Sequence, residues 1–416
     1  MARVPALGFI FVTLFLDVLG IGLVIPVLPK LVAEFRGGDV SAASHTVGVL
    51  VALYSLLQFL CAPVLGNLSD RYGRRPVILG SLFGSGVDYL LLAWAPNLGW
   101  FFLGRMVAGI TGANFTAASA YIADISPPEK RAGNFGLIGA AFGLGFIAGP
   151  AVGGLLGNAS LRLPFLVAAG VTLLNWLYGL WILPESLPVR HRRSFDWRRA
   201  NPLGSLLALR TYPLVLALSG TFFLIHTAQN MLHATWVLYT GYRYGWTAGQ
   251  VGVSLAIVGL MAALVQGVLA RRLIPALGEP RAMLMGLAIS ATAMVGYGWA
   301  PRGWMIYVIL VFGSLGGIAG PAAQGLISRT VAMNEQGAVQ GALSSLASVS
   351  GIVGPPLGAG VFGWFIGGRA PVALPGAAFF FASALMLTAL TLGWRALRRH
   401  GPRTGTGARA APGSTD

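Results

Sequence analysis

The sequence predicts an all-α integral membrane protein with twelve transmembrane helices in two pseudo-symmetric six-helix halves. Of its 416 residues, 56% are hydrophobic and only 10% are charged, whereas a soluble domain carries roughly 25% charged residues. Long apolar runs recur along the chain, and a hydrophilic stretch from Pro184 to about Arg210 separates them into two groups. A lipid bilayer is the solvent in which so much apolar surface is stable.

Each apolar run is long enough to cross a bilayer, which takes about 20 residues in a helix. The first six spans are expected near 7–33, 46–66, 76–95, 98–122, 133–157 and 163–183. The second six are expected near 212–239, 248–270, 281–300, 303–327, 336–366 and 371–397. The predicted domains are an N-terminal six-helix bundle (1–184), a cytoplasmic central loop (185–210), a C-terminal six-helix bundle (211–397) and a disordered cytoplasmic tail (398–416).

The net charge of +16 does not indicate a nucleic-acid partner, because the basic residues sit in short breaks between apolar runs. With both termini placed in the cytoplasm, 21 of the 28 Lys and Arg residues fall in inside segments and six fall outside. The remaining one, Arg105, falls within a span. This bias follows the positive-inside rule. The sequence therefore predicts a multi-pass protein of the cell (inner or plasma) membrane with both termini cytoplasmic.

Two motifs repeat at the same offset of 205 residues, which indicates a duplicated six-helix unit. The fifth span reads Gly149-Pro150-Ala-Val-Gly153-Gly154, and the eleventh reads Gly354-Pro355-Pro-Leu-Gly358-Ala359. The loop after the second span reads Gly73-Arg74-Arg75-Pro76, and its degraded counterpart reads Gly278-Glu279-Pro280-Arg281.

The loop between the second and third spans is the most specific motif of the chain. It contains Gly66, Asp70, Arg71, Gly73, Arg74 and Arg75, in the order Gly-Asn-Leu-Ser-Asp-Arg-Tyr-Gly-Arg-Arg. A Gly permits a tight turn, and an Asp accepts charge-assisted hydrogen bonds from Arg or from a helix N-terminus. Asp124, at the end of the fourth span, is expected within reach of Arg74 or Arg75. The alternative is an ordinary basic loop that only fixes topology.

With this loop, the chain resembles the major facilitator superfamily and, within it, the tetracycline-efflux branch of the drug:proton antiporters. The fifth span resembles the antiporter motif of that superfamily through Gly145, Gly149, Pro150, Gly153 and Gly154. The first, third and fourth spans add the stretches that begin at Asp17, Asp88 and Arg105, the last of which reaches Asn114. The resemblance implies alternating-access export of a small molecule in exchange for protons. Where better-known tetracycline exporters carry a His and an acid in the second half, this chain has Ala262 and Ser290.

Ionisable residues inside the spans are few. Ionising a carboxylate at mid-bilayer costs about 2.5–3.5 kcal/mol or more, yet Asp17 and Asp88 both lie near the middle of their predicted spans. A carboxylate that alternates between ionised and protonated forms is what proton coupling requires. Arg105 is expected to pair with one of them, since Arg does not deprotonate. The alternatives are a neutral, hydrogen-bonded Asp and a purely structural ion pair with Arg105.

The second half offers a polar stripe instead of acids. His226, Gln229, Asn230 and His233 share one face of the seventh span. Together with Asn114, Gln266 and Gln324, they are predicted to line a substrate cavity, although a His in an apolar helix is more often a packing residue. No cofactor, metal site or enzymatic motif is predicted. The predicted protein is a monomeric, proton-coupled exporter of an amphipathic, tetracycline-like drug; a metabolite or sugar carrier and a non-transporting receptor or scaffold are the alternatives.

Overall fold

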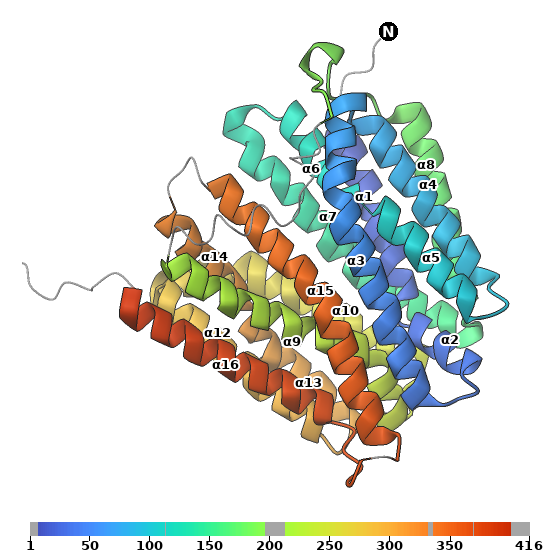
Figure 1. Cartoon of the computed structure of the whole chain (residues 1–416), viewed down its shortest axis with the longest axis vertical. Helices are drawn as coiled ribbons and strands as arrows, with labels where there is room; N and C mark the ends of the chain where they lie inside the picture. The colour runs from blue at the N-terminus through green and yellow to red at the C-terminus, as the bar shows by residue number, and fades with distance from the viewer. Residues whose placement is uncertain (1–6, 113, 196–212, 332–335, 369, 401–416) are drawn as a thin grey trace, which may run out of the picture.

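The computed structural model describes residues 7–112, 114–195, 213–331, 336–368 and 370–400, and the described part is helical throughout, with no strand in it. The helices formed by residues 7–182 gather on one side of the molecule, and those formed by residues 213–400 gather on the other (Figure 1).

The first half contains eight α-helices and one short 3₁₀ turn within the described residues. They are α1 (Leu7–Val24), α2 (Leu28–Phe35), α3 (Val40–Tyr72), α4 (Arg74–Ala93), α5 (Leu98–Thr111), α6 (Asn114–Ile125), α7 (Pro128–Ala159), α8 (Leu163–Ile182) and η1 (Val189–His191). The second half consists of α9 (Pro213–Tyr244), α10 (Ala248–Leu264), the π-helical turn η3 (Val265–Leu269), α11 (Ala270–Leu277), α12 (Glu279–Trp299), α13 (Gly303–Gly313), the 3₁₀ turn η4 (Ser314–Ile318), α14 (Ala319–Thr330), α15 (Gln336–Ile366) and α16 (Ala377–His400).

Several predicted spans are interrupted, each at a recognisable local feature. The first span breaks between α1 and α2, where Pro26 and Pro29 cannot continue the backbone hydrogen bonding. The fourth breaks at Gly112, which follows the last residue of α5, so that α5 and α6 are each shorter than a membrane crossing. The eighth contains the π-helical turn, and the tenth contains the 3₁₀ turn. Consequently, eleven helical segments of the described residues are long and apolar enough to span a membrane, and α5 with α6 occupies the remaining predicted span.

The ends of other spans also differ from the prediction, because capping residues set them. α3 begins at Val40, since the Asp39 side chain accepts a 3.0 Å hydrogen bond from the Ala42 amide. It ends at Tyr72, where Gly73 adopts a φ of 109° that favours glycine. α16 starts at Ala377 rather than near 371 and extends to His400. Most of the predicted central loop and disordered tail lies outside the described residues, so the four domain limits stay predictions.

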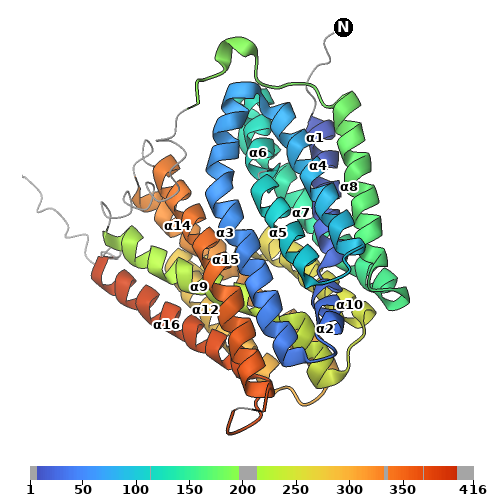
Figure 2. The same cartoon turned by 45° about the vertical axis from the view of Figure 1, so that its right-hand side comes forward.

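The two halves meet at one end of the molecule and separate toward the other. Helices of the two halves converge where α3 packs on α15 and α7 packs on α10. They diverge toward the end that carries the junction of α3 and α4 and residues 184–195 (Figures 1 and 2). We call these the converging end and the diverging end. α1 begins and α16 finishes at the diverging end.

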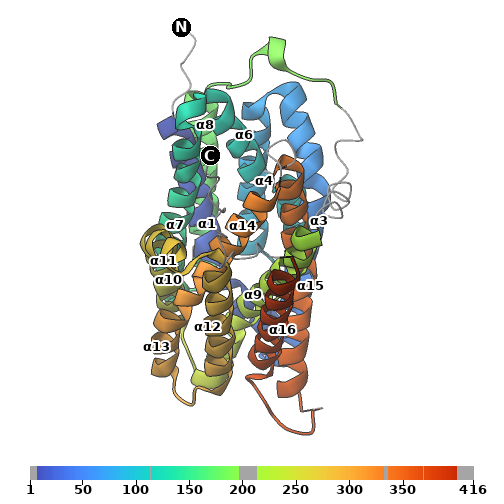
Figure 3. The same cartoon turned by 90° about the vertical axis from the view of Figure 1, so that its left-hand side faces the viewer.

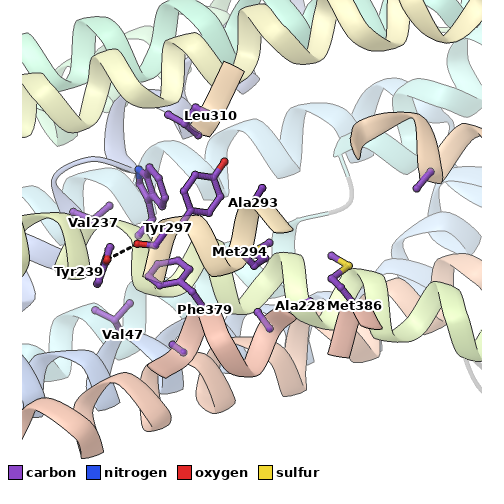
Figure 4. Packing of buried hydrophobic residues seen from close by; sticks show 14 of the residues in the cluster. Val47, Ala228, Val237, Tyr239, Ala293, Met294, Tyr297, Leu310, Phe379 and Met386 are labelled. Carbon is purple, nitrogen blue, oxygen red and sulfur yellow. Dashed lines mark hydrogen bonds between the residues drawn. The ribbon is translucent and has the colours of Figure 1, made fainter. Parts of the chain in front are cut away.

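Hydrogen bonds between side chains of the first half and backbone groups of the second half hold the converging end together. Ser41 and Ser44 of α3 donate 2.8 Å hydrogen bonds to the Gly363 and Ala359 carbonyls of α15. Asn158 accepts a 2.9 Å hydrogen bond from the Gly249 amide, at the start of α10. A buried apolar cluster continues across the boundary and includes Val47 from α3 (Figure 4).

Aromatic packing consolidates the second half beside this boundary. Tyr239 donates a 2.5 Å hydrogen bond to the Tyr297 carbonyl, and its ring centroid lies 4.5 Å from that of Phe379 (Figure 4). Tyr239 and Phe379 are fully buried. Burying aromatic rings with their polar atoms paired is a strong stabilising arrangement, and it holds α9, α12 and α16 together.

Candidate functional site

A buried ion pair lies inside the first half. Asp88 of α4 and Arg105 of α5 are joined through Oδ2 and Nη2, and their side chains are 2% and 16% exposed. Gly104 makes room for the pair, because a Cβ there would lie 2.5 Å from Asp88 Oδ1. The sequence left Asp17 and Asp88 as possible partners of Arg105, and in the structure Asp88 forms an ion pair with it.

Asp17 belongs to the same electrostatic cluster. It is buried in α1, and Tyr54 of α3 and Tyr89 of α4 both interact electrostatically with Asp17, Asp88 and Arg105. The Arg105 guanidinium lies 5.9 Å from the centre of the Tyr54 ring. The structure therefore brings all three predicted coupling residues together, from α1 and from the consecutive helices α4 and α5.

The pair is not fully satisfied by hydrogen bonds. Among the described residues, Asp88 Oδ1 and Arg105 Nε are buried atoms without a hydrogen-bond partner. An ionised carboxylate in a dry site normally has both oxygens paired. Asp88 Oδ1 is therefore an acceptor position that no described side chain or backbone group occupies.

Sequence reasoning missed the residues that surround this cluster. Gln58 of α3 donates to the Tyr54 hydroxyl at 3.1 Å and to the Gly112 carbonyl at 3.0 Å. Gly112 is the residue at which the fourth span breaks, so Gln58 binds a carbonyl that the break leaves free. The only signal in the sequence is their spacing: Tyr54 and Gln58 lie four positions apart, and therefore on one face of α3, a helix that also carries other polar residues.

The loop after α3 forms a second charged network, at the diverging end. Arg74 donates to Asp70 at 2.5 Å, to Asp124 at 3.0 Å and to the Ser69 hydroxyl at 2.7 Å. It thereby ties the end of α3, the start of α4 and the end of α6 together. Arg75 instead donates to the Leu180 carbonyl of α8.

Other residues of the motif have different surroundings. The exposed Arg71 has its guanidinium 5.1 Å from the Tyr72 ring centre. A Cβ on Gly66 would meet Thr116 at 3.8 Å, an ordinary contact distance, so Gly66 is not required there by crowding.

Residues 184–195 lie across this network, which the sequence did not reveal. Glu185 accepts hydrogen bonds from the Arg74 amide at 2.9 Å and the Arg75 amide at 3.3 Å. Its carboxylate therefore caps the N-terminus of α4, where the helix dipole favours a negative charge.

Two further hydrogen bonds attach the same segment to the network. Ser186 donates to Asp124 at 3.1 Å, and the Arg193 amide donates to the Asp70 carbonyl at 3.1 Å. A cavity of about 360 Å³ lies between the segment and the network, and its lining includes Asp70, Arg74, Asp124 and His191.

The glycines of the fifth span are contact points between helices. A Cβ on Gly149 would lie 2.7 Å from the Gly22 Cα of α1, and one on Gly153 would overlap the Leu23 backbone. Gly145 packs against Val18 in the same way. On another face of α7, a Cβ on Gly154 would lie 2.5 Å from the Ala248 carbonyl oxygen of α10. α7 therefore packs closely on its own half and on the other half at once.

The repeated motif in α15 makes equivalent contacts. A Cβ on Gly354 would lie 2.8 Å from the Thr227 carbonyl of α9, and one on Gly358 would lie 2.8 Å from Met231. α15 thus packs on α9 as α7 packs on α1. The offset found in the sequence corresponds to a structural repeat.

The predicted cavity residues are spread over the second half. His233 is exposed on α9, and the rings of His226 and Phe222 are tilted at 48° to each other with their centroids 4.1 Å apart. Asn230 donates to the His226 carbonyl at 2.9 Å, and its Cβ faces Gly354 of α15. Gln229 is half-buried.

The two other glutamines predicted to line the cavity are exposed. Gln266 lies in the π-helical turn, and Gln324 donates to Gln340 at 3.3 Å. The Asn114 side chain lies outside the described part. The structure therefore does not gather these residues into one enclosed pocket.

Comparison with known proteins shows which family the chain belongs to. The family model described as Major Facilitator Superfamily matches residues 10–355. The class C tetracycline resistance protein of Escherichia coli is 46% identical over 350 residues, which cover 84% of this chain and 88% of that protein. The class B protein of Escherichia coli is 39% identical over 349 residues, which cover 83% and 86%. The chain belongs to the Major Facilitator Superfamily.

Solved structures agree with this membership. The human organic anion transporter MFSD10 (TETRAN) matches with a TM-score of 0.68 and 26% identity, over 93% of this chain and 98% of that one. The D-xylose–proton symporter matches with a TM-score of 0.73 and 18% identity, over 94% and 97%, which shows the shared fold. The predicted major facilitator fold is confirmed. As a superfamily member, the chain is a multi-pass membrane transporter rather than an enzyme.

Proposed function

We propose that the chain is a proton-coupled exporter of an amphipathic, tetracycline-like small molecule that works by alternating access. The observation that carries this proposal is the Asp88–Arg105 ion pair, which is buried in the first half beside Asp17. An acid at mid-membrane depth is expensive to keep ionised. Its presence next to a permanent cation is useful to a protein that must load and release a proton.

The proton cycle follows from the chemistry of the three residues. Arg105 stays charged, so it favours the ionised form of whichever acid faces it. Burial favours the protonated form of the same acid. A small change in exposure or in the Arg105 contact is therefore enough to move a proton on or off Asp88 or Asp17. The proton-motive force then supplies about 2.3 kcal/mol per charge per 100 mV.

Alternation between two conformations is supported by the asymmetry of the two ends. The converging end is held by contacts between α3 and α15 and between α7 and α10, and the helices separate toward the other end. Rocking of one half against the other would exchange these arrangements. The close glycine contacts of α7 and α15 would serve as the pivots, and the Arg74 network would act when the diverging end closes.

The orientation that we propose puts the diverging end in the cytoplasm of the cell. Both termini and the central loop would then lie on the side that carries 21 of the 28 Lys and Arg residues. In this orientation, the described conformation opens inward. The protein would act as a monomer in the cell membrane.

The substrate class comes from the relatives and from the second half. Both Escherichia coli relatives are named tetracycline resistance proteins. Since Ala262 and Ser290 offer no titratable group, proton coupling would rest on the first half. We propose that polar side chains supply contacts to the substrate as the halves rock, namely those of Asn114, His226, Gln229, Asn230, His233, Gln266 and Gln324.

Two measurements test the function. Cells with and without the protein are compared on a panel of drugs, and tetracycline is expected to show raised tolerance. Tetracycline added to inverted vesicles under an imposed pH gradient should accumulate and release protons from the lumen at the same time. Tetracycline accumulation that is the same with and without the pH gradient would contradict the proposed exchange. Release of protons from the lumen in the absence of any tested drug would contradict it as well.

A further inference from the structure

The diverging end also carries an interhelical ion pair in the second half, which lacks acids at mid-membrane depth. Glu279 Oε1 lies 3.1 Å from Arg329 Nε. Glu279 is the first residue of α12, and Arg329 lies in the last turn of α14. These two helices pack side by side (Figure 3). Gly325 leaves room for the carboxylate, because a Cβ there would lie 2.9 Å from Glu279 Oε1.

This pair occupies the same repeat positions as the Arg74–Asp124 pair of the first half. The offset of 205 residues that relates Gly149 to Gly354 also relates Arg74 to Glu279 and Asp124 to Arg329. The residues before the two pairs, Gly73 and Gly278, both have positive φ, of 109° and 79°. The same two helix ends are therefore tied in each half, with the charges exchanged.

The exchange of charges changes the balance with the helix dipoles. Glu279 at a helix N-terminus and Arg329 near a helix C-terminus both complement the dipoles of their helices. Arg74 at an N-terminus and Asp124 near a C-terminus both oppose them. The first-half pair accordingly has the further partners Asp70 and Glu185. The position equivalent to Asp70 in the second half is Pro275, which offers no carboxylate.

We infer that Glu279 and Arg329 are positioning residues that hold the diverging ends of α12 and α14 in register for closure of that end. This inference rests on the proposed function, since closure matters only to a protein that alternates. The first-half pair has the additional partners Asp70 and Glu185. In the second-half pair, by contrast, the Glu279 side chain is 15% exposed and the Arg329 side chain is 80% exposed. The second-half pair would therefore hold α12 and α14 through a partly solvated ion pair, whose loss has a modest effect.

The test measures closure directly, without any substrate. Spin labels are attached to Val189→Cys and Trp394→Cys in a Cys61→Ser background; both native side chains are exposed, at 76% and 43%. The fraction of short label-to-label distances is measured at the pH where the parent populates both short and long distances. The variants are Glu279→Gln, Arg329→Gln, the double neutral variant and the exchange Glu279→Arg with Arg329→Glu. Arg272→Gln and Glu34→Gln serve as controls, because both residues are exposed.

Each single neutral variant is expected to lower the short-distance fraction about threefold. The double neutral variant should lower it no further, because the two residues act as a unit. The exchange should recover part of the loss, which a variant that merely misfolds would not do. Across the variants, the maximum rate of tetracycline transport should fall as the short-distance fraction falls, while the KM for tetracycline stays unchanged.

Three results would overturn the inference. One is single variants that behave like the two controls. Another is a double variant whose effect is the product of the single effects. The last is a parent protein that shows the same single label-to-label distance at every pH, because a diverging end that never closes needs no positioning residues. Absence of tetracycline export by the parent would instead contradict the proposed function, and the distances would still report on the pair.

Discussion

Asp88 and Arg105 form a buried ion pair between α4 and α5, and one oxygen of the carboxylate has no hydrogen-bond partner among the described residues. Gly104 provides the space for it. Because Asp17 acts on the same two tyrosines as this pair does, a change at any one of the charged groups alters the field at the others. The first half therefore contains a compact electrostatic unit of two acids and one base.

Replacing Asp70 by Asn tests the loop after α3. Asp70 accepts a 2.5 Å charge-assisted hydrogen bond from Arg74. Weakening of this hydrogen bond in Asp70→Asn should leave membrane insertion intact and reduce tetracycline export about tenfold or more. Asp39→Asn is the matched control, because Asn caps a helix as well as Asp does and Asp39 lies at the converging end. Export at the parental rate in Asp70→Asn would reduce the motif to a topology signal.

Glu185→Gln tests whether residues 184–195 belong to the same network. The carboxylate accepts from the Arg74 amide at 2.9 Å and also from the Ser186 and Leu187 amides, both at 3.0 Å. A neutral amide keeps the shape but weakens these bonds. Limited proteolysis should cut this segment several times faster in the variant, and export should fall. Unchanged cleavage, with Glu34→Gln as the control, would show that Glu185 does not hold the segment.

The glycine contacts of α7 are tested by Gly149→Ala against Gly139→Ala. The added methyl group at 149 would lie 2.7 Å from Gly22 Cα, whereas nothing lies within 4 Å of the one at 139. Overpacking of this kind costs about 1–3 kcal/mol. The purified Gly149→Ala protein should melt at a lower temperature and export poorly, while Gly139→Ala should match or exceed the parent. Equal behaviour of the two variants would contradict the close α1–α7 contact.

Reporter fusions test the orientation. A cytoplasmic reporter fused between residues 186 and 195 should be active, and one fused near Arg302 should be silent. The reason is the excess of Lys and Arg on the side of the central loop. The reverse pattern of reporter activity would contradict the proposed orientation and, with it, the proposed direction of transport.

Hydropathy was sufficient to predict the membrane spans, because a span must be a run of apolar residues whatever its neighbours are. It could not locate the helix ends. The break at Gly112 is accompanied by a tertiary hydrogen bond, from the Gln58 side chain of α3 to the Gly112 carbonyl. Such bonds form only after α3 and α5 have packed together.

The candidate site was predictable only in part, for the same reason. Asp17, Asp88 and Arg105 stand out because a charge within an apolar run is costly. Tyr54 and Glu185 do not stand out, since tyrosine is common near membrane surfaces and Glu185 lies in a hydrophilic stretch. Their roles come from tertiary contacts with Arg105 and with the start of α4, which one sequence does not reveal.

Uphill drug accumulation by Asp17→Asn is the most direct test of proton coupling. The neutral amide removes the cost of ionisation, so the variant should insert and fold at least as well as the parent. Exchange of tetracycline across the membrane without a gradient should survive, because rocking of the two halves does not itself need that proton. Uptake into inverted vesicles is measured with and without an imposed pH gradient, and Asp39→Asn serves as the control. We predict that Asp17→Asn loses accumulation against the tetracycline gradient; accumulation at the parental rate would contradict a coupling role for Asp17.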